Sequence, residues 1–379
     1  MAKKKNVLPS EQAVFHNNRG ISYLSQGDLE RAIFEFQTAS ELAPEFAEPL
    51  SNLGLIYKIQ GKNEQAISWF LQAAGKSKTY ASPHNHLAAT YLAMGRLEDA
   101  MTQAKKAIKM DPLMADAHYN LGLIWLEKDQ REHNSKYVSA AEKEFKKTTE
   151  LNPNLEPVHL RLAAMYREQG KYDLAIVRYR LALGISNSAD VWETLGNLYL
   201  EIGDPFKAQN CFQKAIEVRP DSEAAHIQLG TFYLNQKRFD EALAEFQAAV
   251  DINPKNETAW FRLGTLKMDQ GEYAEALEFL QKAKRINPNY SDAVYNLGIV
   301  ELKLGKTDQA KADWEYVLTI DPACARAQYN LALLSAQSGN MKEAGKYYCG
   351  FLQNAKGGFP AEEGLARKFV GDKGIKCQN

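Results

Sequence analysis

Histidine is the residue type in this chain best suited to hold a metal ion, and five of its seven histidines recur at one position of a repeat. They are His16, His84, His118, His159 and His226. Equivalent positions in neighbouring helical repeats lie about 10 Å apart, a helix-packing distance, whereas zinc lies about 2 Å from each ligand. Two such histidines therefore cannot share an ion. We interpret all five as packing residues and expect no metal site.

Sequence motifs of enzymes are absent from the chain. It contains no G-x-x-x-x-G-K-S/T loop, no G-x-S-x-G nucleophile, no H-E-x-x-H pair and no dinucleotide-binding glycine motif. The four cysteines, Cys211, Cys324, Cys349 and Cys377, form no C-x-x-C pair, so a zinc knuckle or thioredoxin-type motif is unsupported. We expect reduced, mostly structural thiols, because a Cys349–Cys377 bridge would need an oxidising compartment.

The charge of the chain is nearly balanced, with 46 Lys and Arg residues against 47 Asp and Glu residues among 379. This balance argues against a surface built to grip nucleic acid or an anionic membrane. No segment is long and apolar enough to span a bilayer. The basic start, residues 1–5, is followed by no apolar segment of a signal peptide, so we expect a cytoplasmic protein without membrane insertion.

An internal repeat organises nearly the whole chain. Four prolines are spaced by 34 residues, with an alanine twelve residues before each: Pro220, Pro254, Pro288 and Pro322. The same alanine marks ten units, which start at residues 13, 47, 81, 115, 156, 189, 223, 257, 291 and 325. The array covers residues 13–358 and leaves a basic tail at residues 1–12. The fourth unit carries an insertion within residues 127–137, which we expect to be a polar surface loop.

Each unit has the pattern of two amphipathic helices. In the sixth unit, Trp192, Leu195 and Tyr199 follow the spacing of one helix face. The second helix pairs a small alanine with an aromatic residue four positions later, as in Ala242 and Phe246. A proline ends most units, because proline cannot continue a helix. A glycine, which suits a helix end, follows the first helix in eight units: Gly27, Gly61, Gly95, Gly170, Gly203, Gly271, Gly305 and Gly339.

This spacing resembles that of the tetratricopeptide repeat family, whose pattern is W-x2-L-G-x2-Y…A-x3-F…P. The resemblance implies an all-α fold of about ten helix pairs stacked into a right-handed solenoid, with the first helices on the concave face. We expect residues 359–370 to form a C-terminal capping helix and residues 371–379 to fray. Only 33 residues lie outside the array, too few for a catalytic domain, so we expect no enzyme activity and no cofactor.

In this family the sixth residue of each first helix projects into the concave groove. Here these residues are Asn18, Asn52, His86, Asn120, Arg161, Thr194, Gln228, Arg262, Asn296 and Asn330. The amide of asparagine offers a peptide backbone both a donor and an acceptor. The row is similar to the asparagine ladder in the tetratricopeptide domain of the O-linked N-acetylglucosamine transferases, without their transferase domain. The fifth-position rings are candidate pocket walls: Tyr119, Tyr295 and Tyr329.

We therefore expect a non-enzymatic adaptor or scaffold that binds extended peptide segments of other proteins in its groove, and no nucleic acid. Two alternatives stay open. One is a structural protein that forms a homo-oligomer by packing its groove on neighbouring copies, and the other is a regulatory subunit of an enzyme. The asparagine row itself has an alternative explanation, which is descent of all repeats from one duplicated unit.

Overall fold

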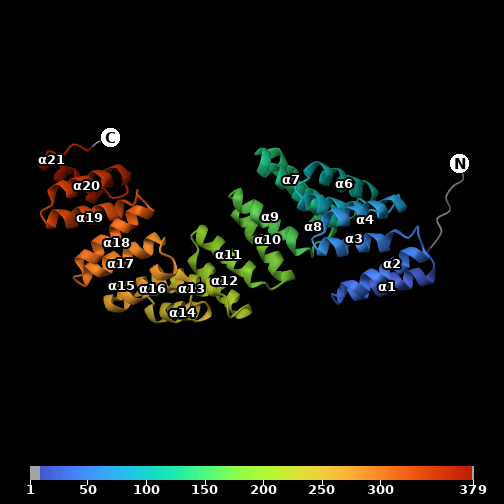
Figure 1. Cartoon of the computed structure of the whole chain (residues 1–379), viewed down its shortest axis with the longest axis horizontal. Helices are drawn as coiled ribbons and strands as arrows, with labels where there is room; N and C mark the ends of the chain where they lie inside the picture. The colour runs from blue at the N-terminus through green and yellow to red at the C-terminus, as the bar shows by residue number, and fades with distance from the viewer. Residues whose placement is uncertain (1–8, 378–379) are drawn as a thin grey trace. The chain divides into compact units, whose positions relative to one another are not determined.

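The structure is a computed structural model that describes residues 9–377, and in this range it contains 21 helices and no strand. Figure 1 shows these helices as successive antiparallel pairs joined by short turns. The chain divides into two compact units, at residues 1–186 and 187–379. Each unit is an all-α helical repeat, as the sequence pattern predicts.

The first unit contains five helix pairs. Within a pair the two helices pack on each other, and the second helix also packs on the first helix of the next repeat. First helices of consecutive repeats contact one another from α1 to α3, from α3 to α5 and from α5 to α7, so they form a continuous layer. The helices are α1 (Glu11–Ser25), α2 (Leu29–Leu42), α3 (Ala47–Ile59), α4 (Asn63–Lys76), α5 (Ser82–Ala93), α6 (Leu97–Met110), α7 (Ala115–Glu132), α8 (Ser135–Leu151), α9 (Glu156–Glu168) and α10 (Tyr172–Ile185).

The second unit repeats this arrangement with five further pairs and a final helix. First helices again contact one another, from α13 to α15 and from α15 to α17, and the final helix packs on α20. The helices are α11 (Ala189–Glu201), α12 (Pro205–Val218), α13 (Glu223–Asn235), α14 (Phe239–Ile252), α15 (Glu257–Gln270), α16 (Tyr273–Ile286), α17 (Ser291–Lys303), α18 (Thr307–Ile320), α19 (Ala325–Gln337), α20 (Met341–Asn354) and α21 (Pro360–Asp372).

A residue in the left-handed region sets the turn inside each repeat. All eight glycines predicted to end first helices have positive φ, between 69° and 81°. Where the sequence offers no glycine, His133 and Lys237 adopt φ of 50° and 58°. Asp204 caps α12 by accepting a hydrogen bond from the Lys207 amide at 3.1 Å, and Pro205 is the first residue of that helix. The local sequence therefore decides where each helix stops and the next begins.

The two helices of a repeat approach closely where a glycine faces a large side chain. A Cβ built at Gly196 would lie 2.7 Å from the Phe212 ring, and one built at Gly298 would lie 2.5 Å from the Trp314 indole. Both rings are fully buried or nearly so. Any side chain at these glycines would have to displace the ring, because the interior is already close-packed.

The insertion in the fourth repeat is helical, so the predicted surface loop is wrong. α7 continues to Glu132 and α8 begins at Ser135, which leaves two residues between them. Seven additional residues amount to about two helical turns at 3.6 residues per turn, and both helices of this repeat are longer than their counterparts. Trp125 of α7 stacks on Tyr137 of α8, with ring centroids 5.4 Å apart. The insertion is therefore a packed extension of the helix pair.

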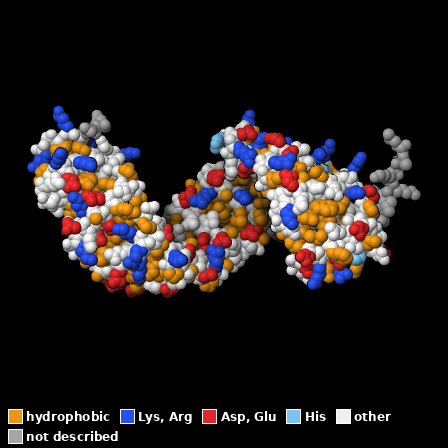
Figure 2. All heavy atoms as spheres, viewed as in Figure 1, with side chains coloured by type: hydrophobic (Ala, Val, Ile, Leu, Met, Phe, Trp, Pro, Cys, Tyr) orange, Lys and Arg blue, Asp and Glu red, His pale blue; other side chains and the backbone are white. Residues whose placement is uncertain are grey.

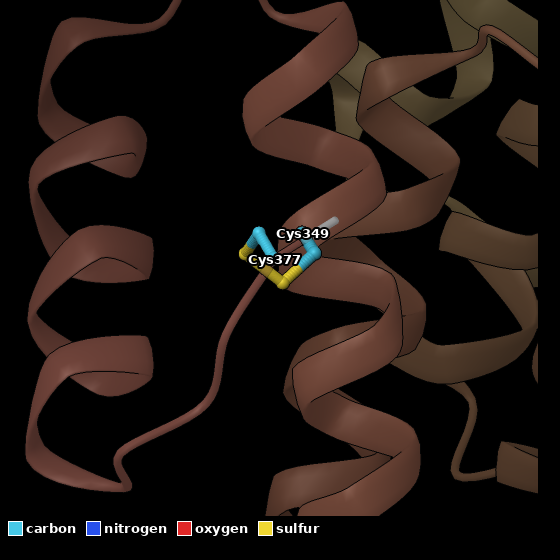
Figure 3. The surroundings of a disulfide bond; sticks show 2 residues. All are labelled: Cys349 and Cys377. Carbon is cyan, nitrogen blue, oxygen red and sulfur yellow. A yellow bond between two sulfur atoms is a disulfide. The ribbon is translucent and has the colours of Figure 1, made fainter. Parts of the chain in front are cut away.

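The C-terminal segment is packed as well, so the fraying predicted for residues 371–379 is wrong as far as residue 377. α21 continues to Asp372, and the chain then turns back toward α20. There Cys377 forms a disulfide with Cys349 (Figure 3). This bond also corrects the expectation of reduced thiols for these two residues. Spacing alone did not predict this bond, because the two cysteines are 28 positions apart and the predicted helices did not specify how the chain returns to α20 after α21.

The other two cysteines lie outside the disulfide, and the first helix begins close to the start of the described residues. Cys211 is buried and Cys324 is half-buried, and neither takes part in a disulfide within residues 9–377. α1 begins at Glu11, inside the predicted basic tail, and the Ser10 side chain caps it by accepting from the Ala13 amide at 3.2 Å. The rest of that predicted tail, residues 1–8, lies outside the described residues, as do residues 378–379.

Candidate peptide-binding face

The sixth-position residues lie on the first helices, five in each unit. We call the row in the first unit the ladder, which consists of Asn18, Asn52, His86, Asn120 and Arg161. Asn18 and Arg161 are exposed, and the three residues between them are half-buried. The first four lie on α1, α3, α5 and α7, the helices that form the continuous layer. The ladder therefore begins on one connected surface.

Two ladder asparagines are hydrogen-bonded to the preceding repeat. Asn52 Nδ2 donates to Asn17 Oδ1 at 3.0 Å, and Asn120 Nδ2 donates to Asn85 Oδ1 at 2.7 Å. Asn17 is 1% exposed and Asn85 is 7% exposed, so both acceptors are buried. Each bond fixes the side chain of a ladder asparagine, whose amide keeps its own carbonyl oxygen and a second N–H hydrogen. The sequence analysis did not identify Asn17 or Asn85 as partners.

His86 lies between the two amide pairs. Its ring stacks on Phe70 of α4, with centroids 5.3 Å apart and an interplanar angle of 30°. Burial, followed by the nearby Lys58 ammonium group, lowers the pKa of His86 to about 4. The ring is therefore neutral near pH 7 and has one nitrogen that donates and one that accepts a hydrogen bond. In this respect it resembles the amides on either side.

An apolar strip runs beside the ladder at the ninth position of each first helix. Ile21 is 46% exposed, although it is a large aliphatic residue. The other members of the strip are half-buried: Leu55, Ala89, Leu123 and Ala164. The first helices of this unit thus present polar groups and apolar side chains in parallel rows, three positions apart along each helix.

The sixth-position residues of the second unit bond to more varied partners. Gln228 Nε2 donates to Asn197 Oδ1 at 3.4 Å, and Asn330 Nδ2 donates to the Tyr295 hydroxyl at 3.2 Å. Asn296 is half-buried. The amide pairs of the first unit have one counterpart here, between glutamine and asparagine, so the row is chemically less regular than the ladder.

Two sixth-position residues of the second unit turn toward their own helix or repeat. Thr194 Oγ1 donates to the Asp190 carbonyl one turn earlier at 2.8 Å. The Arg262 guanidinium lies 5.7 Å from the centroid of the Phe261 ring, and its Nε atom is buried without a hydrogen-bond partner. Thr194 and Arg262 therefore interrupt the row of amides in the second unit.

The three fifth-position tyrosines pack on the second helices of their own repeats. Tyr119 lies 5.7 Å from Phe145 of α8, and Tyr329 lies 5.1 Å from Phe351 of α20, measured between ring centroids. Tyr295 is 9% exposed and lies near the indole of α18. The structure thus places these rings in the contact between helices.

Two of the fourth-position histidines, His118 and His226, each connect the second helix of their repeat to the turn that precedes the repeat. His226 Nδ1 lies 2.6 Å from Glu245 Oε2 on the second helix, and Nε2 lies 3.1 Å from the Pro220 carbonyl in the preceding turn. Because both partners accept hydrogen bonds, they favour the doubly protonated ring, and Glu245 is the main cause that raises the pKa of His226. His118 makes the same two contacts, with Glu144 and Pro112.

Charged and apolar side chains are mixed on the surface. Figure 2 shows lysines and arginines interspersed with aspartates and glutamates over the visible face of both units. Within residues 9–377, no three His, Cys, Asp or Glu side chains are grouped so that they could hold a metal ion. None of the described helices has the length and hydropathy that crossing a membrane requires.

Three protein-family models match the chain. One described as "Tetratricopeptide repeat" matches residues 233–298 and 267–312, and a second with the same description matches residues 193–257 and 295–358. A third, described as "TPR repeat", matches residues 20–61 and 90–129. Together these matches cover well over half of the chain. No curated protein matches the sequence.

Solved structures match the chain at low sequence identity. The crystal structure of MamA is 26% identical, over 42% of this chain and 94% of MamA, with a TM-score of 0.39. A thermophilic TPR protein from Thermus thermophilus is 21% identical, over 50% of this chain and 99% of its own, with a TM-score of 0.40. Yeast Tom70 is 14% identical over 96% of both chains, with a TM-score of 0.42.

Proposed function

Because the chain belongs to the tetratricopeptide repeat family, we propose that it is an adaptor that binds extended peptide segments of other proteins along the ladder of its first unit. Repeats of this family build scaffolds for protein–protein interaction, and their proteins are typically non-enzymatic. The proposal adds a binding surface and a kind of ligand to that general role.

The two amide pairs carry the proposal. Asn52 and Asn120 are held by bonds of 3.0 Å and 2.7 Å to buried acceptors, so their remaining polar atoms are fixed before a ligand arrives. Fixed groups lose less conformational entropy on binding than mobile ones. An amide that donates and accepts complements the backbone of any peptide, so recognition depends weakly on sequence.

The spacing of the repeats suits an extended chain. Repeats stack at about 10 Å and an extended peptide advances about 3.3 Å per residue, so one repeat spans about three peptide residues. The four ladder residues from Asn18 to Asn120 would hold about twelve residues. Side chains of the peptide that point toward the protein would meet the apolar strip that includes Ile21 and Leu55.

The test uses a pair of double variants that break the same two bonds. Peptides that bind the immobilised full chain are selected from a library of random twelve-residue sequences, and the dissociation constants of several selected peptides with unrelated sequences are measured. The double variant Asn52→Ala with Asn120→Ala removes the amides of these two ladder residues, and each selected peptide should bind it at least about tenfold more weakly than it binds the wild-type chain. Asn17→Ala with Asn85→Ala removes the buried partners and keeps the ladder amides, so it controls for the lost bonds between repeats.

Three results would count against this function. One is a library that yields no binding peptide under any buffer used in selection, and another is equal binding by the two double variants. The third is a loss of binding confined to one peptide sequence, which would show that the chain reads side chains rather than a backbone. Circular dichroism of each variant checks that helix content is retained.

One observation favours a second function, self-association. Leu174, Val177 and Leu181 lie on one face of α10 and are 48%, 52% and 46% exposed. The corresponding positions of the third repeat carry polar residues, Asp99, Thr102 and Lys106. A face of this kind is typical of a contact between copies. Mass measured against concentration should rise toward a dimer, and Leu181→Glu should stay monomeric; a wild-type chain that stays monomeric throughout would exclude this function.

A further inference from the structure

The segment after α21, which we call the tail (residues 373–377), lies against α20 and is held there at several points. The Ile375 amide donates to the Val370 carbonyl at 2.9 Å, which turns the chain back after the helix. The Ile375 side chain sits directly over Gly345 of α20, where a built Cβ would overlap its Cδ1 atom. One turn further along α20, Cys349 is joined to Cys377 (Figure 3).

Gly345 forms a notch that the other repeats lack. It is buried, and it occupies a position of the second helix at which six other repeats carry a long aliphatic side chain: Ile33, Ile67, Met101, Ile176, Leu243 and Leu277. In the last repeat the helix has no side chain at this position, and Ile375 of the tail supplies one instead. The contact is therefore shaped for a branched aliphatic residue that arrives from outside the helix.

The tail covers only part of a larger hollow. A cavity of about 640 Å³ lies beside it, lined by α18, α19, α20 and the tail, and Glu315, Thr319 and Tyr347 contribute to its walls. A second cavity of about 400 Å³, which Leu352 and Val370 help to line, adjoins the disulfide. Ligand pockets commonly measure about 300–1,000 Å³. The surface around the tail thus has room for more chain than the tail itself.

We propose that this surface is a second peptide-binding site, which takes an extended segment with a branched aliphatic side chain in the Gly345 notch and which the tail occupies while the disulfide is closed. The tail is the internal counterpart of that ligand. The site is separate from the ladder and does not depend on the function proposed for it, because it lies on a second helix in the other unit.

The disulfide decides whether an outside segment can compete. A dithiol reductant attacks one protein sulfur, forms a mixed disulfide and releases the other cysteine as a thiol. Its second thiol then closes the reductant's own disulfide, so two electrons and two protons pass to Cys349 and Cys377. While the bond is closed, the tail cannot leave. After reduction it is tethered only through α21, and it competes as a non-covalent ligand of high effective concentration.

The test removes the internal competitor and supplies its sequence from outside. The probe is a fluorescent peptide of residues 371–379 with Cys377→Ser, and the receptor is the full chain with Ile375→Gly in dithiothreitol. We expect saturable binding by fluorescence anisotropy. A probe that also carries Ile375→Gly should bind about tenfold more weakly, which corresponds to the partial burial of one aliphatic side chain. The receptor without reductant should bind the probe at least tenfold more weakly.

A filled notch provides the control. Gly345→Leu, added to the Ile375→Gly receptor, places an aliphatic side chain in the notch and should abolish binding; Gly345→Ala is the smaller alternative if the leucine variant has reduced helix content. Failure of the probe to bind the reduced Ile375→Gly receptor would overturn the proposal. Equal binding by the receptor with a filled notch would overturn it as well, because the peptide would then lie elsewhere.

Hydrogen exchange of the wild-type chain tests the closing role of the disulfide. The Ile375 and Gly374 amides donate to the Val370 and Gly371 carbonyls. Their exchange should become at least tenfold faster when dithiothreitol is added, while amides in the middle of α13 should not change. Unchanged exchange at these two amides after complete reduction, verified by mass, would show that the disulfide does not hold the tail in place.

Discussion

The bond between Asn52 and Asn17 makes a prediction about stability that is independent of any ligand. In Asn52→Ala, the Asn17 Oδ1 atom loses its donor at 3.0 Å and remains buried, because Asn17 is 1% exposed. A buried polar atom left without a partner costs about 1–3 kcal/mol. Asn18 lies on the same helix as Asn17 and is exposed, so Asn18→Ala should change the free energy of unfolding by less than about 0.5 kcal/mol. Asn52→Ala and Asn18→Ala therefore form a matched pair of substitutions.

A double-mutant cycle isolates the bond itself. Asn17→Ala leaves Asn52 able to turn its amide to water, since Asn52 is only half-buried, so this variant should lose less stability than Asn52→Ala. The combination of both substitutions should be less destabilising than the sum of the single ones, with a coupling energy of about 0.5–1.5 kcal/mol.

Native-state hydrogen exchange is the appropriate assay, because contacts in repeat proteins run between neighbours and unfolding is local. The loss in Asn52→Ala should appear in α1 to α4 and fade along the first unit. The reasoning would be refuted if Asn52→Ala and Asn18→Ala had the same stability, or if the cycle gave no coupling. Either result would mean that the side chains do not hold the two repeats together.

Three further predictions concern packing, pH and metal. Ala242→Trp overpacks a fully buried position and should lower the free energy of unfolding by about 1–3 kcal/mol. Amide hydrogen exchange should become faster mainly in α13–α16, and exchange that is accelerated uniformly over both units would contradict this prediction. Burial, followed by the nearby Asp313 carboxylate, raises the pKa of Glu301 to about 7, although Lys284 and Lys306 oppose this shift. Protonated Glu301 therefore contributes to the stability of the folded state at pH values below the ordinary pKa of glutamate, and this contribution is lost as pH rises through 7. Glu301→Gln should therefore raise the melting temperature at pH 8 but not at pH 4. Equal shifts of the melting temperature at both pH values would show that ionisation of Glu301 is not the cause. EDTA should leave the melting temperature unchanged, because both ring nitrogens of His118 and of His226 contact protein acceptors; a drop in melting temperature that zinc reverses would refute this prediction.

Local features of the fold were predictable because their causes are local. A glycine at a helix end and an Asp-Pro pair at a helix start each act within a few residues, and the structure has the turns where they occur. The insertion forms helix rather than a surface loop, because polar residues suit an exposed helix face as well as they suit a loop. Glu127–Tyr137 contains neither glycine nor proline and is rich in good helix formers, so composition pointed to longer helices.

The partners in the candidate site were harder to predict because they lie one repeat away. Asn52 and Asn120 each bond a residue 35 positions earlier in the sequence. A pattern was nevertheless present: an asparagine at the fifth position of one repeat precedes an asparagine at the sixth position of the next, at Asn17 and Asn85. The disulfide and the tail had no such pattern, because their geometry depends on how α21 ends.

The amide pairs change what the recurrence of asparagine means. A sixth-position asparagine that bonds the preceding repeat has a structural reason to be there, so Asn52 and Asn120 cannot by themselves separate peptide binding from stability. Asn18 belongs to the first repeat of the array, and Asn296 follows a repeat whose fifth residue, Phe261, has no polar side-chain atom. Within residues 9–377, neither asparagine forms an amide pair of this kind. Asn18 is therefore the ladder residue whose contribution to binding would be separate from any contribution to the packing of repeats.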